Sequence, residues 1–273
     1  MLRFSTLGIA LLATFAVSLG LAPAASAQVS LADQLQIGPP VRRAEPPSPN
    51  ASATDLEHRG DQLRAEKAFL DALDYYRAAL AKSPNNALIY NKMGITELLM
   101  TRYRAARKDF ERAVRADRKY ADAYNNLGVI HYLQKSYVKA VKLYQKAIEF
   151  RGDSASFYSN LGTAHFAKKD YASAMAAYSR AMELDPDVFE RSSHSGVSAQ
   201  MSSPEDRAYY DYLLAKMYAK MGLADRSLQY LRRSMEEGYK NIEQVYKDNE
   251  FAELRKDPRF ASLMTTRPLA IPE

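Results

Sequence analysis

Two of the four histidines are the first residues whose type and spacing could support chemistry. His131 and His165 are 34 residues apart, and zinc in proteins commonly takes imidazole ligands. If 34 residues form one structural repeat, the two side chains are separated by the packing distance of neighbouring helices, roughly 8 to 10 Å. Two ligands of one zinc ion must each bring a donor atom to about 2 Å from the metal. We therefore expect packed histidines and no metal site.

No other residues form a catalytic or cofactor-binding pattern. The sequence has no cysteine, which excludes disulfides, thiolate metal sites, cysteine nucleophiles and lipid attachment at a cysteine. It also lacks a GxSxG turn, a phosphate-binding loop and an HExxH motif. Glu236 and Glu237 are interpreted as a solvated helix end, because no apolar surroundings are predicted to raise either pKa. We expect neither an enzyme nor a cofactor.

The basic residues are spread along the chain, which carries a net charge of +6. Their densest stretch, residues 102–120, is the nearest candidate for a nucleic-acid site. Asp109, Glu111 and Asp117 interrupt it, so a solvated helix face is favoured over nucleic-acid binding. Contact with anionic envelope polymers or with a membrane surface is a weaker alternative.

The elements that position these residues are predicted by a 34-residue period. Gly60, Gly94, Gly128 and Gly162 follow this step. Three further ladders share it, namely Ala72, Ala106, Ala140 and Ala174; Ala79, Ala113, Ala147 and Ala181; and Phe69, Tyr103, Tyr137 and Tyr171. Each unit is predicted to be an antiparallel helix pair, in which glycine and alanine permit close packing. One pair cannot cover its own apolar face, so neighbouring pairs must stack into an all-α solenoid.

These residues resemble the tetratricopeptide repeat (TPR) family. The best match to the family pattern is the fourth unit, with Tyr158, Leu161, Gly162, Ala174, Tyr178, Ala181 and Pro186. The sequence departs from the pattern at Arg59, Arg118 and Gly152. The resemblance implies a right-handed α-solenoid of antiparallel helix pairs that binds a protein or peptide. It also places His131 and His165 where the family has a buried aromatic residue.

The predicted organisation has seven parts. They are a signal peptide (1–27), a disordered proline-rich tether (28–52), four contiguous repeats (53–86, 87–120, 121–154 and 155–188), a loop insertion (189–204), a diverged fifth repeat (205–238), C-terminal capping helices (239–264) and a tail (265–273). The insertion is either a surface loop or a rim of the binding face. The C-terminal segment is similar to the end-of-group segment of some bacterial TPR proteins.

The first residues indicate export. Arg3 precedes an apolar run that ends in Ala25, Ser26 and Ala27, the small-residue pattern after which signal peptidase cleaves. We predict cleavage after Ala27 and a periplasmic or secreted protein. An uncleaved membrane anchor is the alternative, because the apolar run approaches the length that spans a bilayer. The tether could instead be a proline-rich ligand of another module.

The candidate binding surface follows from the resemblance, which implies that the first helix of each pair lines the concave side of the solenoid. The partner-binding residues predicted there are Asn91, Lys92, Ile95, Leu98, Asn125, Asn126, Val129, Tyr132, Ser159, Asn160, Thr163 and Phe166. Asn126 and Asn160 are similar to an asparagine ladder that holds a peptide backbone in some relatives, since an amide both donates and accepts hydrogen bonds. The alternative, weighted equally, is that both asparagines are only polar residues on the helix surface.

Two further features limit the prediction. Lys92 interrupts the asparagine ladder, so a peptide track would be short. Ile95 and Ser156 stand where the family's clamp for a C-terminal carboxylate has asparagine and lysine, so no preference for a free carboxylate is expected. The predicted function is an exported scaffold that binds an unidentified protein or extended peptide. A structural subunit of an envelope-associated or homo-oligomeric assembly is the alternative.

Overall fold

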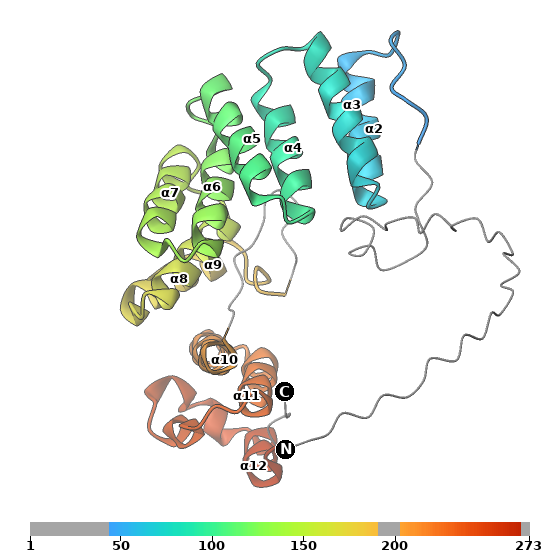
Figure 1. The fold of residues 1–273 in the computed structure, drawn as a ribbon. Coiled ribbons are helices and arrows are strands. Elements are labelled where there is room, and N and C mark those ends of the chain that lie inside the picture. Colours follow the sequence, from blue (N-terminus) through green and yellow to red (C-terminus); the bar gives the residue numbers. More distant parts are fainter. Residues whose placement is uncertain (1–43, 191–202, 269–273) are drawn as a thin grey trace, which may run out of the picture. The chain divides into compact units, whose positions relative to one another are not determined.

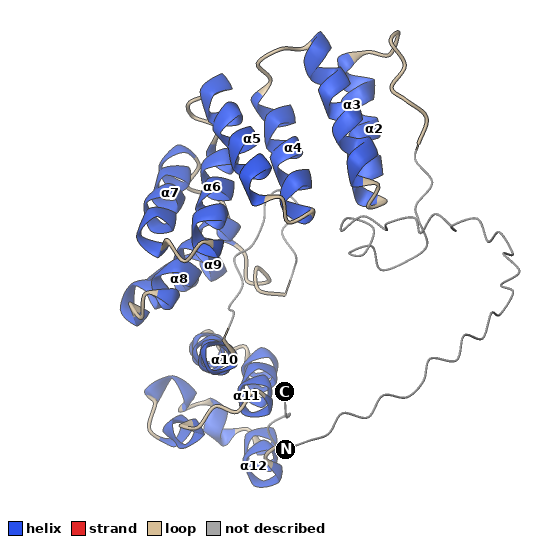
Figure 2. Ribbon diagram, viewed as in Figure 1, coloured by secondary structure: helices blue, strands red, loops and turns tan. Residues whose placement is uncertain are grey.

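The computed structural model describes residues 44–190 and 203–268, and this part of the chain is helical without any strand (Figure 2). The helices are α2 (Ala53–Ala65), α3 (Phe69–Lys82), α4 (Ala87–Leu99), α5 (Tyr103–Ala116), α6 (Ala121–Leu133), α7 (Tyr137–Phe150), α8 (Ala155–Ala167), α9 (Tyr171–Leu184), α10 (Pro204–Lys220), α11 (Ala224–Glu236), η1 (Ile242–Tyr246), η2 (Asn249–Phe251), η3 (Leu254–Lys256) and α12 (Pro258–Thr266). None of them is both long and apolar enough to cross a bilayer. The predicted all-α fold is confirmed.

Consecutive helices pack as antiparallel pairs, α2 with α3 and so on to α10 with α11 (Figure 1). In the first four pairs a glycine of the first helix lies against an aromatic ring of the second. A Cβ atom built on Gly128 would be 2.5 Å from Cε1 of Tyr144, closer than any real contact, so only glycine fits. The fifth pair has Ala215 and Leu231 at the equivalent positions, both inside one hydrophobic cluster. In the fifth pair, leucine replaces the aromatic ring, and this smaller side chain leaves room for the methyl group of Ala215.

The fifth pair also replaces the two small alanines of the second helix by serines. Ser227 Oγ donates a 2.8 Å hydrogen bond to the carbonyl oxygen of Ala215, and Ser234 Oγ donates one of the same length to Ala208. Both serines are fully buried, so these bonds satisfy hydroxyls that would otherwise cost free energy. The diverged pair therefore keeps the close helix packing by different means.

Each first helix of the four regular pairs ends in the same turn. The second residue after each helix has a positive φ, between 57° and 63°, at Lys67, Thr101, Lys135 and Lys169. The next residue donates its backbone N–H to a carbonyl five residues earlier, as in Ser136 N to His131 O at 2.8 Å. This arrangement is the Schellman motif, which normally favours glycine at the left-handed position. Gly222 occupies that position in the fifth pair.

Residues 44–52 differ from the predicted disordered tether. They form no helix, turn at residues 49 and 50, and lie along α3, where Tyr75 donates to the carbonyl of Glu45 at 3.1 Å and Lys82 Nζ donates to the carbonyl of Pro49 at 2.7 Å. Ala44 and Ala51 pack on the hydrophobic cluster of the first pair. Proline stops helix formation here, but backbone carbonyls still bind the side chains of α3. Residues 1–43, with the predicted signal peptide, lie outside the described residues.

The C-terminal residues pack on the fifth pair. Val245, Phe251 and Phe260 are buried in the same cluster as Leu214 and Tyr218. α12 begins as the sequence predicts, because Asp257 accepts a hydrogen bond from the backbone of Arg259 and proline follows at the first helical position. Much of the predicted insertion, residues 191–202, lies outside the described residues. Phe189, before it, packs edge-on against Tyr178 of α9 and Tyr210 of α10.

Candidate protein-interaction surface

The predicted asparagines form hydrogen bonds with one another between neighbouring first helices. Asn126 Nδ2 donates to Asn91 Oδ1 at 2.9 Å, and Asn160 Nδ2 donates to Asn125 Oδ1 at 2.9 Å. Asn125 Nδ2 connects the two bonds by donating to Asn126 Oδ1 at 3.2 Å. The resulting chain runs from α4 through α6 to α8, and we call it the asparagine ladder. Both inter-helix bonds join residues that are 35 positions apart.

The asparagine ladder is buried. None of its four residues is more than 3% exposed, and α6 contacts both α4 and α8. A buried amide requires hydrogen bonds, and these amides supply some of them to one another between the helices. Asn126 and Asn160 have further interactions besides those within the ladder. The ladder therefore stabilises the packing of neighbouring first helices.

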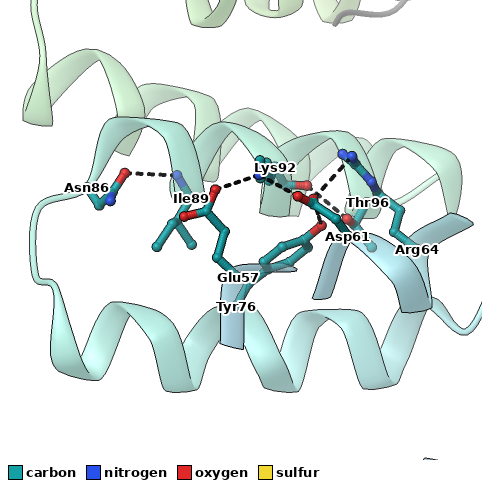
Figure 3. A network of polar contacts seen from close by, with 8 residues as sticks. All are labelled: Glu57, Asp61, Arg64, Tyr76, Asn86, Ile89, Lys92 and Thr96. Atoms are coloured by element: carbon teal, nitrogen blue, oxygen red, sulfur yellow. Dashed lines mark hydrogen bonds and ion pairs between the residues drawn. The ribbon is translucent and has the colours of Figure 1, made fainter. Parts of the chain in front are cut away.

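The ladder continues into the first pair in ionic form. Lys92 Nζ of α4 donates to Glu57 Oε1 of α2 at 2.5 Å, again across 35 positions, and to Asp61 Oδ2 at 2.6 Å (Figure 3). Arg64 lies 3.3 Å from the other Asp61 oxygen. We call Glu57, Asp61, Arg64 and Lys92 the ion cluster. Lys92 interrupts the run of asparagines in the sequence, but it makes the same contact between neighbouring first helices, with an ion pair in place of an amide pair.

The ion cluster is tied to the packing between helices and is also open to solvent. Tyr76 of α3 donates to Asp61 Oδ1 at 2.7 Å, and burial together with this carboxylate raises the pKa of the Tyr76 hydroxyl (Figure 3). The four charged side chains are between 15% and 32% exposed. Glu57 and Asp61 are not among the residues that the sequence predicted. The offset of 35 residues between Glu57 and Lys92 is the signal that could have indicated Glu57.

The remaining predicted residues are mostly core residues. Leu98, Val129, Tyr132, Thr163 and Phe166 are buried. Two of the rest, Ile95 and Ser159, are half-buried. Of the twelve predicted residues, only Lys92, Ile95 and Ser159 are partly exposed. Lys92 and Ile95 lie on α4 of the second pair, and Ser159 lies on α8 of the fourth.

Phe166 is buried by aromatic rings that lie after the insertion in sequence. Its ring is 5.7 Å from that of Tyr209 and 6.1 Å from that of Tyr210, both on α10, and 5.2 Å from that of Tyr171. The 34-residue register is lost between the fourth and fifth pairs, so this contact could not be predicted from the repeat. It explains why Phe166 lies in the core and not on a binding face.

The two histidines have different polar surroundings. His165 Nδ1 is 3.0 Å from Asp170 Oδ2. His131 has a buried Nδ1 with no hydrogen-bond partner in the described part of the chain, and burial lowers its pKa, assisted by Lys139 and Arg107. Among the described residues there is no group of three histidine or carboxylate side chains that could hold a metal ion.

Comparison with known proteins identifies the protein family. Two family models described as tetratricopeptide repeat match residues 91–155 and 155–188. Together with the stacked helix pairs, these matches show that the chain belongs to the tetratricopeptide repeat family, whose members are typically non-catalytic scaffolds. No curated protein sequence matches the chain.

Among solved structures the chain is similar to PilF of Pseudomonas aeruginosa. That likeness has a TM-score of 0.53 at 17% identity and covers 79% of this chain and 92% of PilF, which supports the fold alone. MamA of Desulfovibrio magneticus has a TM-score of 0.48 at 16% identity, covering 69% of this chain and 96% of its own. YrrB, titled a TPR protein with an unusual peptide-binding site, has a TM-score of 0.46 at 18% identity, covering 72% and 91%.

Proposed function

We propose that the protein is an exported interaction scaffold that holds an extended segment of a partner protein against its first helices. The observation that supports this most directly is the partly exposed ion cluster between α2 and α4. Its two carboxylates and two cations offer charged contacts, and the half-buried Ile95, one turn after Lys92 on α4, offers an apolar contact. A fold defines no function by itself, so the proposal depends on this surface.

The asparagine ladder supports the proposal in a different way from the one predicted. Three equivalent polar contacts, one partly exposed and two buried, hold α2, α4, α6 and α8 together. A preorganised surface binds with a smaller loss of conformational entropy than a mobile one. We therefore assign the ladder to positioning the first helices, and the partner contacts to the ion cluster, Ile95 and Ser159.

Site-specific photo-crosslinking tests the assignment. A photoreactive phenylalanine analogue at Ile95 or Ser159 is expected to capture the same partner in native cells. The matched control is Gln145, which is exposed on the second helix α7. Capture at Gln145 with equal yield, or from no first-helix position, would contradict a partner on the first helices.

Two measurements, the identity of the crosslinked species and sedimentation, separate the scaffold from a structural subunit. If the crosslinked species is a second copy of the chain and sedimentation shows a concentration-dependent oligomer, the protein is a structural subunit.

A bound peptide is expected to have equal affinity as free acid and as amide, because no carboxylate clamp is present at Ile95 and Ser156. Export predicts a purified native protein that begins at Gln28, which N-terminal sequencing measures directly.

A further inference from the structure

A second surface of the described chain lies at the turns inside the helix pairs. Because paired helices are antiparallel and successive pairs stack, the turns inside pairs are at one end of the helices and the turns between pairs are at the other. The turns inside the four regular pairs lie within residues 65–70, 99–104, 133–139 and 167–172. We call this end the inner-turn edge. It does not include the ion cluster.

The inner-turn edge carries most of the exposed apolar side chains. Eight large hydrophobic residues of the described chain are exposed, and six of them are at turns inside pairs. They are Leu70, Leu99, Tyr103, Leu133, Val138 and, in the fifth pair, Met221. Val138 is the most exposed of them, at 58%. Single exposed apolar residues are ordinary, but their gathering at one end of the helices is not.

The same edge is basic. The four turns contain seven Lys or Arg residues and two carboxylates, Glu66 and Asp170. The turns at the opposite end, within residues 83–88, 116–122, 150–156 and 184–188, contain three Lys or Arg residues and five aspartates. The two ends of the helices therefore differ in sign. Arg104, Lys135, Lys139 and Lys168 form no ion pair with any carboxylate of the described residues.

A surface that is both basic and apolar matches an anionic lipid bilayer. Apolar side chains enter the boundary between head groups and acyl chains, while Lys and Arg extend to the phosphates. Each basic residue near such a surface contributes about 1 kcal/mol. A single-stranded nucleic acid would use the cations too, but it also requires aromatic side chains for base stacking, and of the six exposed apolar residues of the edge only Tyr103 is aromatic.

We propose that the inner-turn edge docks on the surface of an anionic membrane, with Leu99, Leu133 and Val138 in the interface and Lys135, Lys139 and Arg104 at the lipid phosphates. The pairs then stand on the bilayer by one end of their helices. The ion cluster, between α2 and α4, stays free for a protein partner.

The sequence has no tryptophan, so one introduced tryptophan reports on one position. Leu133→Trp in the full chain is expected to give a blue shift of emission, and quenching by brominated lipid, with vesicles of phosphatidylglycerol and phosphatidylcholine. It is expected to give neither with phosphatidylcholine alone. Leu88→Trp, exposed at the opposite end, is the matched control and is expected to give no shift.

Charge variants complete the test in the Leu133→Trp background. Lys135→Gln with Lys139→Gln removes two cations and is expected to weaken vesicle binding about 30-fold. Arg118→Gln with Lys119→Gln, at the opposite end, is expected to leave it unchanged. Circular dichroism verifies that all variants keep their helix content.

Three results would overturn the proposal. One is vesicle binding without a change in Leu133→Trp emission, which would assign membrane contact to residues 1–27 alone. Another is an equal shift from Leu88→Trp. The last is a shift with an oligonucleotide but not with anionic vesicles, which would assign the edge to nucleic acid.

Discussion

At the scale of single residues, one buried hydroxyl is unsatisfied because its repeat lacks the matching side chain. Tyr76 donates to Asp61 and Tyr178 donates to Thr163 at 3.3 Å, in both cases to a residue 15 positions earlier. The equivalent residue for Tyr144 is Val129, which has no acceptor. The Tyr144 hydroxyl is fully buried and has no hydrogen-bond partner among the described residues.

Replacement of Tyr144 by phenylalanine is therefore expected to stabilise the protein. Leaving a buried polar group unsatisfied costs about 1 to 3 kcal/mol, and Tyr144→Phe removes that cost while it keeps the ring that packs on Gly128. Urea unfolding measures the change. Tyr178→Phe is the control and is expected to destabilise by about 1 kcal/mol, since its hydroxyl is bonded. Equal effects of the two substitutions would contradict the explanation.

A second residue, Asp211 of α10, is a buried carboxylate with incomplete pairing. Its side chain is 1% exposed, and burial raises its pKa to about 7, although Arg233 acts in the opposite direction. Arg233 Nε lies 3.2 Å from Oδ2 without hydrogen-bond geometry. Arg207 also lowers the pKa, whereas Glu237 and Glu190 raise it. The folded protein therefore holds a proton here that the unfolded chain releases above its ordinary pKa of 3.8.

The sign of the pH dependence follows from this difference. Between about pH 4 and pH 7 the folded state binds more protons, so the free energy of unfolding falls as the pH rises. Asp211→Asn cannot ionise, and at pH 8 it is expected to be more stable than the wild type by roughly 1 to 4 kcal/mol. At pH 4 the two proteins are expected to be similar. Urea unfolding at both pH values measures this, and parallel profiles would contradict it.

Asp257 is a control of opposite sign for this experiment. The hydrogen bonds of Arg259 lower the pKa of the Asp257 carboxyl. Its contribution to stability is present above the unfolded pKa and is lost as the pH falls. Both differences from the wild type are expected to disappear on acidification, because each carboxyl becomes protonated. Above pH 7 they have opposite signs, since Asp257→Asn is expected to lower the stability and Asp211→Asn to raise it.

At the scale of elements, the contacts between neighbouring first helices share one geometry and differ in chemistry. Lys92 bonds to Glu57 between α2 and α4, and Asn126 bonds to Asn91 between α4 and α6. Both link residues 35 positions apart, so the side chains at one contact should be exchangeable for those at the other.

An exchange at the first contact tests this equivalence. Lys92→Asn alone removes the cation from the partly buried Glu57 and leaves Asp61 paired with Arg64, and it is expected to cost about 1 to 3 kcal/mol. Adding Glu57→Asn creates an amide pair and is expected to restore most of the loss, which urea unfolding of both variants measures. Glu66→Gln, which breaks an exposed pair with Arg59, is expected to cost under about 0.5 kcal/mol. Strict additivity of the two asparagine substitutions would show that the contacts are not equivalent.

The same comparison shows what could be predicted from the sequence. The glycine, alanine and aromatic ladders predicted helix pairs and their stacking, because these residues meet inside one repeat and its neighbour. The exposure of Asn126 and Asn160 was not predictable in this way. Amide side chains suit both a solvated helix face and a buried network, and only their partners, Asn91 and Asn125, distinguish the two. Replacement of Asn126 by alanine is accordingly expected to lower stability.

At the scale of the whole molecule, the repeats end differently at the two sides. Residues 44–52 lie on α3 of the first pair through hydrogen bonds from Tyr75 and Lys82. On the fifth pair, residues after Gly238 add Val245, Phe251 and Phe260 to the core. The larger apolar contribution is thus at the C-terminal side, where Phe251 also packs 5.6 Å from the ring of Tyr212.

Removal of this C-terminal segment is expected to unfold or aggregate the fifth pair. A chain that ends at Gly238 exposes the buried face of α10 and α11. It is expected to show no defined thermal unfolding midpoint and not to sediment as a monomer. A milder variant, Phe251→Ala, is expected to cost about 3 to 5 kcal/mol. A chain that ends at Pro268 keeps all the described packing and is the matched control. Normal stability of the chain ending at Gly238 would show that these residues do not act as a cap.

The ion cluster also determines how such an array can grow by duplication. A second copy of residues 121–154 inserted after the first would place its Asn126 equivalent beside Asn125 and repeat an existing amide contact. A second copy of residues 87–120 would place the ammonium group of its Lys92 equivalent beside Asn91 and Ile95, with neither carboxylate within reach. The third repeat is therefore suited to lengthening the protein, whereas the second is restricted to its place next to the first. Gene duplication and repeat engineering are both expected to follow this asymmetry.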